Sequence, residues 1–126
     1  MFDFPEQAAL QRYYLSSLGL TGVTIISDLN LLAQLISRLR EMPRLFIATW
    51  SLSESALELR RQIAEIVKFF DAFLISYQEQ FPGIDNSAYF SAWRALFPEI
   101  IWTESKIPHL PGNRYLFGRK ETEPRA

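Results

Sequence analysis

Hydrophobic positions along the chain follow two spacings, one typical of helices and one typical of buried strands. In some stretches apolar residues return every three or four positions, which predicts amphipathic helices over residues 5–18, 29–40, 53–70 and 87–97. Between these stretches lie short, continuous apolar runs. Runs of this length predict strands that are covered on both faces, here over residues 23–26, 45–50 and 72–77.

The two ends of this series have patterns of their own. Residues 2–4 form a short apolar stub around one acid, and residues 100–102 and 114–117 have the pattern of the two arms of a hairpin. Strands therefore alternate with helices, which predicts an α/β fold: a mostly parallel sheet with an antiparallel carboxyl-terminal hairpin strand and helices on both faces. We expect one domain over residues 1–119 and a polar tail over 120–126.

Capping residues mark the starts of two predicted helices. Asp3 with Glu6, and Ser51 with Glu54, have the spacing of a capping box, in which the first side chain accepts from a backbone N–H of the first turn. The sequence therefore predicts that helices begin shortly after Asp3 and Ser51.

Composition limits the classes of function. The 126 residues are 48% hydrophobic, enough for one core, and 13 Lys and Arg balance 14 Asp and Glu. No basic surface for nucleic acid or an anionic membrane is expected. The absence of cysteine excludes disulfides and thiolate chemistry, and one histidine excludes a multi-histidine metal centre. Without cysteines, a targeting signal or a run of about 20 apolar residues, a cytoplasmic protein without a metal is expected.

The glycines do not form a phosphate-binding loop. The chain has five glycines, and none of them lies in a G-x-G pattern. A loop of that kind brings backbone N–H groups against phosphate at the start of a helix. The sequence therefore predicts no such cradle for a nucleotide.

Polar residues that follow predicted strands are candidates for ligand binding, because open α/β sheets bind ligands at the carboxyl ends of their strands. Asp3 has two interpretations, an acceptor for ribose hydroxyls or a helix cap. Ser27 and Asp28, which follow the second strand, are interpreted mainly as caps. Trp50 is a large aromatic residue at a strand end, where a ligand would lie, although its neighbours also fit the capping pattern.

The carboxyl-terminal half supplies the remaining candidates. Gln78 and Asn86 flank the loop after the fourth strand, and His109 and Asn113 share the hairpin loop. An imidazole suits a general base near neutral pH, whereas a single histidine in a proline-rich loop also suits packing or hydrogen bonding. Asn113 can orient a hydroxyl group or form a turn.

Several blocks resemble sugar O-methyltransferases, a family of class I S-adenosylmethionine-dependent enzymes. Phe2–Glu6 and Ala9–Leu15 resemble the second strand and the helix that follows it. Phe46–Glu54 is similar to the fourth strand and its exit loop, and Leu74–Phe90 to the fifth strand with its substrate-side loop. Ile107–Gly118 looks like the carboxyl-terminal hairpin. The resemblance implies a partial Rossmann-like sheet that begins at the second strand and has no counterpart of the first strand and its glycine-rich loop.

The family resemblance also implies roles for the candidate residues. S-adenosylmethionine would be the cofactor and a sugar or glycoside the acceptor. The implied cofactor-binding residues are Asp3, Ser27, Asp28, Trp50 and Ser51. The implied substrate-binding residues are Gln78, Asn86 and Asn113, and the implied catalytic residues are His109 and Glu54. Without the glycine-rich loop the chain is expected to be inactive alone, and a missing amino-terminal half or a second copy is an expected partner.

A second hypothesis is non-enzymatic. A small α/β interaction module can bind a partner chain by adding a strand to an exposed sheet edge. Loss of a central strand would leave such an edge, so the same observations support both hypotheses.

Overall fold

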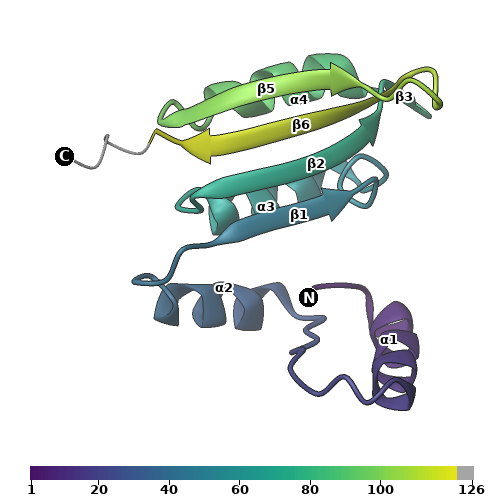
Figure 1. Cartoon of the computed structure of the whole chain (residues 1–126), viewed down its shortest axis with the longest axis vertical. Coiled ribbons are helices and arrows are strands. Elements are labelled where there is room, and N and C mark those ends of the chain that lie inside the picture. Colours follow the sequence, from purple (N-terminus) through teal and green to yellow (C-terminus); the bar gives the residue numbers. More distant parts are fainter. Residues whose placement is uncertain (122–126) are drawn as a thin grey trace. The chain divides into compact units, whose positions relative to one another are not determined.

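A computed structural model describes residues 1–121 and divides the chain into two compact units, residues 1–41 and a second unit that begins at Met42 (Figure 1). Each unit is described by itself. In the described range, no helix is both long enough and apolar enough to pass through a membrane.

The first unit contains two helices and one pair of bridged residues. The helices are α1 (Pro5–Ser17) and α2 (Leu29–Arg38), close to their predicted ranges. Phe2 and Ile26 form a single parallel bridge, in which the Ile26 N–H donates to the Met1 carbonyl and the Asp3 N–H to the Ile26 carbonyl. The prediction of a strand over residues 23–26 is therefore wrong. Residues 2–4 are too short a segment to continue the hydrogen bonding beyond this one bridge, and Val23 is exposed.

Of the two side-chain caps predicted for the helices of the first unit, the structure shows the one at the start of α2. Asp28 is the N-cap of α2, and its Oδ1 accepts from the Leu31 N–H at 2.8 Å, which confirms its interpretation as a cap. In α1 the N-cap is Phe4 and no side chain caps the helix, with Pro5 in the first turn. The capping box predicted between Asp3 and Glu6 is therefore wrong.

The second unit contains the remaining elements. Its larger elements are β1 (Leu45–Thr49), α3 (Leu57–Val67), β2 (Ala72–Gln78), α4 (Asn86–Ala95), β5 (Ile100–Lys106) and β6 (Asn113–Lys120). Two short strands, β3 (Gln80–Phe81) and β4 (Ile84–Asp85), form a small hairpin inside the predicted loop, with Gly83 at a φ of 78° in its turn. Strand β6 includes Lys120 of the predicted tail, and residues 122–126 of that tail lie outside the described residues.

The main sheet of the second unit has the order β1-β2-β6-β5. β1 and β2 are parallel, and β6 runs antiparallel to both of its neighbours. Strands β1, β2 and β5 therefore share one direction, and β6 lies between two of them with the opposite direction. This arrangement confirms the mixed α/β class and the antiparallel carboxyl-terminal hairpin strand.

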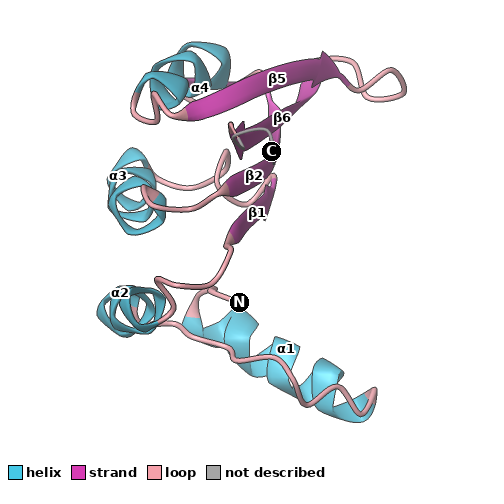
Figure 2. Cartoon of the chain, turned by 60° about the vertical axis from the view of Figure 1, so that its left-hand side comes forward, coloured by secondary structure: helices cyan, strands magenta, loops and turns pink. Residues whose placement is uncertain are grey.

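Helices α3 and α4 lie on the same face of this sheet (Figure 2). The core of that face is aromatic: Phe73 of β2 lies 5.1 Å from Phe97, and Trp93 of α4 lies 5.2 Å from Phe97 between ring centroids. Trp102 of β5 packs over Gly118, where no side chain competes for the space. The prediction of helices on both faces is wrong for this unit, because α3 and α4 both pack against the aromatic face.

Strand β1 is covered on one face only. Ala48 is buried on the helix side, whereas Leu45 and Ile47 are 54% and 58% exposed. An uninterrupted apolar run predicts burial on both faces, so the structure corrects that prediction for β1. In the register of the sheet, Ile47 lies beside Leu74 of β2, and Leu74 lies beside Phe117 of β6. These three residues form an apolar row on the face opposite α3 and α4.

Helix α3 begins later than predicted. Its N-cap is Ala56, which makes no side-chain cap, and residues 51–54 form turns. The capping box predicted between Ser51 and Glu54 is therefore wrong. A hydrogen-bond network around Arg60, described below, uses the carbonyl groups of this turn region instead.

Candidate functional site

The candidate site lies where β1 and β2 end and β6 begins. We call this place the carboxyl edge and define it by Trp50, Gln78 and Asn113. Trp50 follows β1 with a φ of 62°, a left-handed conformation that is uncommon for a residue with a side chain. Its backbone N–H donates to the Ser76 carbonyl at 2.8 Å, and its indole Nε1 donates to Asn113 Oδ1 at 2.8 Å.

These two hydrogen bonds hold a half-buried indole against the ends of three neighbouring strands. Backbone strain at a strand end persists only where surrounding contacts enforce it, and such positions cluster at binding sites. The sequence predicted both Trp50 and Asn113 as candidates. The structure places them in direct contact although 63 positions separate them.

A buried network holds the turn that follows Trp50. Arg60 of α3 is fully buried. Its Nη2 donates to the Ser53 carbonyl at 2.6 Å, its Nε to the Ser55 carbonyl at 2.9 Å, and its Nη1 to Asn86 Oδ1 at 2.7 Å. Its guanidinium also lies 4.8 Å from the centroid of the Tyr89 ring. Uncharged oxygens and an aromatic face thus solvate this buried cation.

Asn86 completes the same network. Its side chain is fully buried, and its Nδ2 donates to the Gln78 carbonyl at 2.9 Å and to the Ser53 carbonyl at 3.2 Å. The side-chain amide therefore joins the end of β2 to the turn after β1. This burial argues against a direct contact between Asn86 and a substrate, and we assign it a positioning role.

Next to the carboxyl edge lies a cluster of charged residues that sequence reasoning did not select. Arg114 of β6 donates from Nε to Glu79 Oε1 at 2.6 Å and from Nη1 to Glu104 Oε2 at 3.2 Å. Glu104 also accepts from the Tyr77 hydroxyl and lies 3.6 Å from Arg94. Only the pairing of β2, β6 and β5 brings these residues together, so no local signal predicts the cluster.

Two tyrosines, the buried Tyr77 and the half-buried Tyr89, have pKa values above the usual value for tyrosine. Burial and the Glu104 hydrogen bond raise the pKa of Tyr77, and burial raises the pKa of Tyr89 to about 12 although the Arg60 charge opposes this shift. The folded protein therefore favours the neutral phenol in both cases.

We expect the free energy of unfolding to fall as the pH rises above about 10, the ordinary pKa of tyrosine. A pKa raised by folding contributes stability that is complete below the unfolded pKa and is lost as the pH increases through the folded one. Urea unfolding of the wild type and of Tyr89→Phe between about pH 8 and 11 measures this loss. The variant should lose less stability, and an identical decline in both proteins would contradict the assignment to Tyr89.

The other candidates of the second unit are less enclosed. His109 is exposed in the loop between β5 and β6, and Gln78 is half-buried at the end of β2. Ser51 and Glu54 are exposed in the turn after Trp50. The structure thus brings Gln78, Asn113 and Trp50 to the carboxyl edge and leaves the imidazole of His109 accessible in the adjoining loop.

The first unit places its own candidates together. Because the bridge between Phe2 and Ile26 is parallel, Asp3 and Ser27 follow it at the same end. Asp3 accepts from Gln11 Nε2 at 2.7 Å and from the Phe4 N–H at 2.9 Å, whereas the buried hydroxyl oxygen of Ser27 has no hydrogen-bond partner.

Comparison with known proteins adds no relative to this picture. No family model, curated protein or solved structure matches the chain. In the described residues, no group of three histidine, aspartate or glutamate side chains could hold a metal ion. The candidate function therefore depends on the geometry of the carboxyl edge, on the pair Asp3 and Ser27 in the first unit, and on the family resemblance of the sequence.

Proposed function

We propose that the chain takes part in S-adenosylmethionine-dependent methyl transfer to a hydroxyl group of a sugar or glycoside, with the acceptor bound at the carboxyl edge. The observation that carries this proposal is the hydrogen bond between Trp50 and Asn113. It holds an indole ring at the strand ends, where α/β sheets bind their ligands. The aromatic face suits the apolar C–H face of a sugar ring, whose hydroxyls then point to polar neighbours.

The chain's own residues would act on the acceptor in two ways. Trp50, to which the family resemblance gives a cofactor-binding role, would here orient the acceptor ring. Asn113 and Asn86, which the resemblance assigns to substrate binding, would act with Arg60 as positioning residues because they hold Trp50 and the turn that follows it. His109, exposed in the hairpin loop, would accept the proton of the reacting hydroxyl. Glu54 is also exposed in the turn after Trp50, but its carboxylate makes no hydrogen bond or ion pair in the described residues that would favour a catalytic role.

The described residues fit part of the proposed cofactor. Asp3 and the unpartnered Ser27 hydroxyl offer hydrogen bonds that suit the ribose and adenine groups. The chain has no glycine-rich loop for the methionine group. S-adenosylmethionine would supply the methyl group when bound, and we expect the chain alone to bind it weakly and to be inactive.

Nuclear magnetic resonance titration tests both halves of the proposal. We expect a panel of methyl glycosides to shift the indole N–H signal of Trp50 and to leave the signals of Trp93 and Trp102 in place. S-adenosylmethionine should shift backbone signals at Asp3 and Ser27, and Asp3→Ala should weaken its binding by about tenfold, the equivalent of about 1.4 kcal/mol.

The controls separate the acceptor from the cofactor. Trp50→Leu should abolish the glycoside response and leave the S-adenosylmethionine response unchanged. No shift at Trp50 with any glycoside at millimolar concentration would reject the acceptor site. Binding of S-adenosylmethionine that Asp3→Ala leaves unchanged would show that the cofactor assignment is wrong.

The second candidate function is an interaction module that pairs through a sheet edge. The specific observation in its favour is the exposure of Leu45 and Ile47 on β1, a terminal strand of the main sheet. An apolar edge strand of this kind is a ready template for pairing with another chain.

A further inference from the structure

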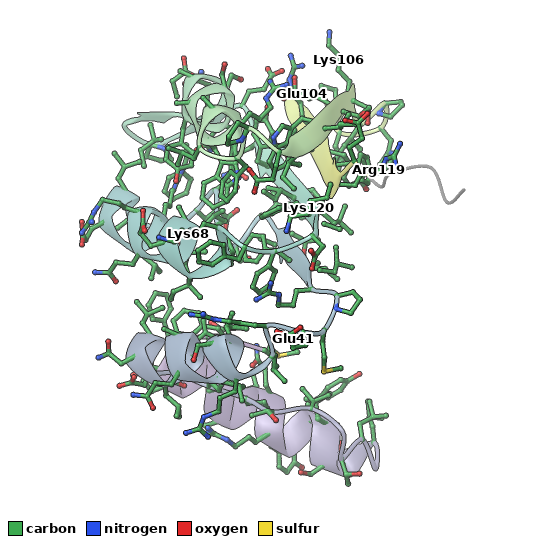
Figure 3. The ribbon with its side chains drawn as sticks, turned by 90° about the vertical axis from the view of Figure 1, so that its left-hand side faces the viewer. Glu41, Lys68, Glu104, Lys106, Arg119 and Lys120 are labelled. Atoms are coloured by element: carbon green, nitrogen blue, oxygen red, sulfur yellow. The ribbon has the colours of Figure 1, made fainter. Side chains whose placement is uncertain are left out.

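The two edges of the main sheet differ in how they are protected. Edge strands usually carry charges, proline or bulges that prevent pairing with other chains. β5, at one edge, carries Glu104 and Lys106 (Figure 3). β1, at the other edge, is Leu-Phe-Ile-Ala-Thr and has no charge, proline or glycine. β1 therefore has none of the sequence features that prevent pairing.

The hydrogen bonds of β1 show which of its groups remain available. The Trp50 N–H donates to the Ser76 carbonyl, and the Arg44 carbonyl accepts from the Ala72 N–H. In a parallel pair, alternate residues direct both backbone groups to the same neighbour. The even-numbered residues of this segment therefore face β2, and Leu45, Ile47 and Thr49 direct their N–H and C=O groups away from it. Of these outward groups, the Thr49 carbonyl already accepts from the Ser51 N–H at 2.8 Å.

We propose that β1 pairs antiparallel with β1 of a second copy of this chain, in a register centred on Ile47. Ile47 then lies opposite the Ile47 of the other copy, and Leu45 lies opposite Thr49. Each outward-facing residue falls in a hydrogen-bonded pair, so the backbone N–H groups of Leu45, Ile47 and Thr49 and the carbonyls of Leu45 and Ile47 gain partners. The Thr49 carbonyl, which already accepts from the Ser51 N–H, would accept a second hydrogen bond. On the side of the sheet that α3 and α4 cover, Phe46 lies opposite the small side chain of Ala48.

A second copy fits this edge because the strand is complementary to itself. A two-fold axis through Ile47 relates identical surfaces, and no charge of β1 meets a like charge across it. The paired edge is about 16 Å long, and so buries less than the roughly 800 Å² per partner of a standard interface. We therefore infer a weak dimer that forms and dissociates with concentration. The pairing specifies the partner of the second candidate function and does not depend on methyl transfer.

Sedimentation velocity of the full chain tests the pairing. Between about 1 and 300 μM, concentrations that span a weak interface, the wild type should change from monomer to dimer. Ile47→Lys, at a position that is 58% exposed, should shift the midpoint at least tenfold upwards because it opposes two ammonium groups at the axis. Ile101→Lys on β5 is the matched control, since Ile101 is 44% exposed on the other edge strand, and it should leave the midpoint unchanged.

A backbone variant distinguishes edge pairing from packing of the apolar sheet faces. Ile47→Pro removes an N–H that faces away from β2, so the β1–β2 ladder remains and the dimer should be lost. In the wild type, amide exchange at Leu45, Ile47 and Thr49 should slow as the concentration rises. A monomer throughout the range, or a dimer that Ile101→Lys disrupts and Ile47→Pro does not, would overturn the proposal. Neither result bears on the binding of glycosides or S-adenosylmethionine, which the titrations above measure separately.

Discussion

Arg60→Met is expected to lower the free energy of unfolding of the second unit by about 4 kcal/mol. The wild-type guanidinium donates to the carbonyls of Ser53 and Ser55 and to Asn86 Oδ1, and it is fully buried. Methionine fills much of the space of the arginine stem but donates no hydrogen bond. Asn86 Oδ1 and the Ser55 carbonyl lose the guanidinium donor, whereas the Ser53 carbonyl keeps its hydrogen bond from Asn86 Nδ2. Each buried acceptor left without a partner costs about 1–3 kcal/mol.

Urea unfolding followed by tryptophan fluorescence measures this loss, because all three tryptophans belong to the second unit. Arg61→Met is the matched control. Arg61 is exposed and pairs with Glu58 on the surface of the same helix, so its replacement should change stability by less than about 1 kcal/mol. If Arg60→Met cost no more than Arg61→Met, the buried network would not hold the turn after β1.

The same variant connects stability with the candidate site. Because Arg60 holds the turn that follows Trp50, its loss should also alter the environment of the Trp50 indole. We expect a shift of the Trp50 N–H signal in Arg60→Met under conditions in which the protein is still folded. An unchanged signal would mean that the bond to Asn113 orients Trp50 without help from this turn.

Gly118→Ala is expected to destabilise the second unit by about 3 kcal/mol. A Cβ atom at Gly118 would lie 2.5 Å from Cζ3 and 2.7 Å from Cε3 of Trp102, and 2.8 Å from Cγ2 of Ile100. These atoms belong to side chains packed in the sheet, so relief of the clash requires displacement of the Trp102 ring from its contact with Phe73.

A double-mutant cycle gives this prediction a specific test. Trp102→Leu removes the ring that the new methyl group would strike, so the double variant should lose clearly less stability than the sum of the two single variants. Urea unfolding of the four proteins provides the coupling free energy. Additive losses would show that the cost of Gly118→Ala arises from the strand itself and not from contact with Trp102.

The sequence predicted most elements of the fold because their patterns are local. The bounds of helices α1 and α2 and of strands β1 and β2 lie close to the predicted ranges, because sequence patterns of this length depend on neighbouring residues only. The apolar face predicted for α1 is not buried, since Leu10, Tyr13 and Tyr14 are exposed. The predictions are wrong where the local structure depends on contacts with residues far away in the sequence. The run over residues 23–26 has the composition of a strand, but only Ile26 finds a bridge partner.

The delayed start of α3 has the same kind of cause. The spacing of Ser51 and Glu54 favours a capping box, yet the carbonyls of Ser53 and Ser55 accept from a buried guanidinium. The three hydrogen bonds that the Arg60 guanidinium donates stabilise this turn more than a local helix cap, which contributes about 1 kcal/mol. A sequence pattern cannot show this competition, because the position of Arg60 relative to the turn depends on the packing of α3.

The candidate site was predictable in its parts but not in its arrangement. Trp50 and Asn113 were identified as polar or aromatic residues near strand ends. Their contact depends on β6 lying beside β2. The cluster of Glu79, Glu104 and Arg114 was not predicted, because no local feature distinguishes these charged residues from a solvated surface. Glu79 follows β2, whereas Glu104 and Arg114 lie on the terminal hairpin.

The sequence by itself determined the alternation of helices and strands, the α/β class and the absence of cysteine chemistry, because these depend on composition and on short-range spacing. Only the tertiary structure decided that β6 lies between β2 and β5, that α3 and α4 share one face, and that β1 is a terminal strand of the sheet with exposed apolar residues. These features depend on which strands become neighbours. That choice is made by the packing of residues far apart in the chain, such as Phe73 against Phe97 and Trp102, and Trp102 over Gly118.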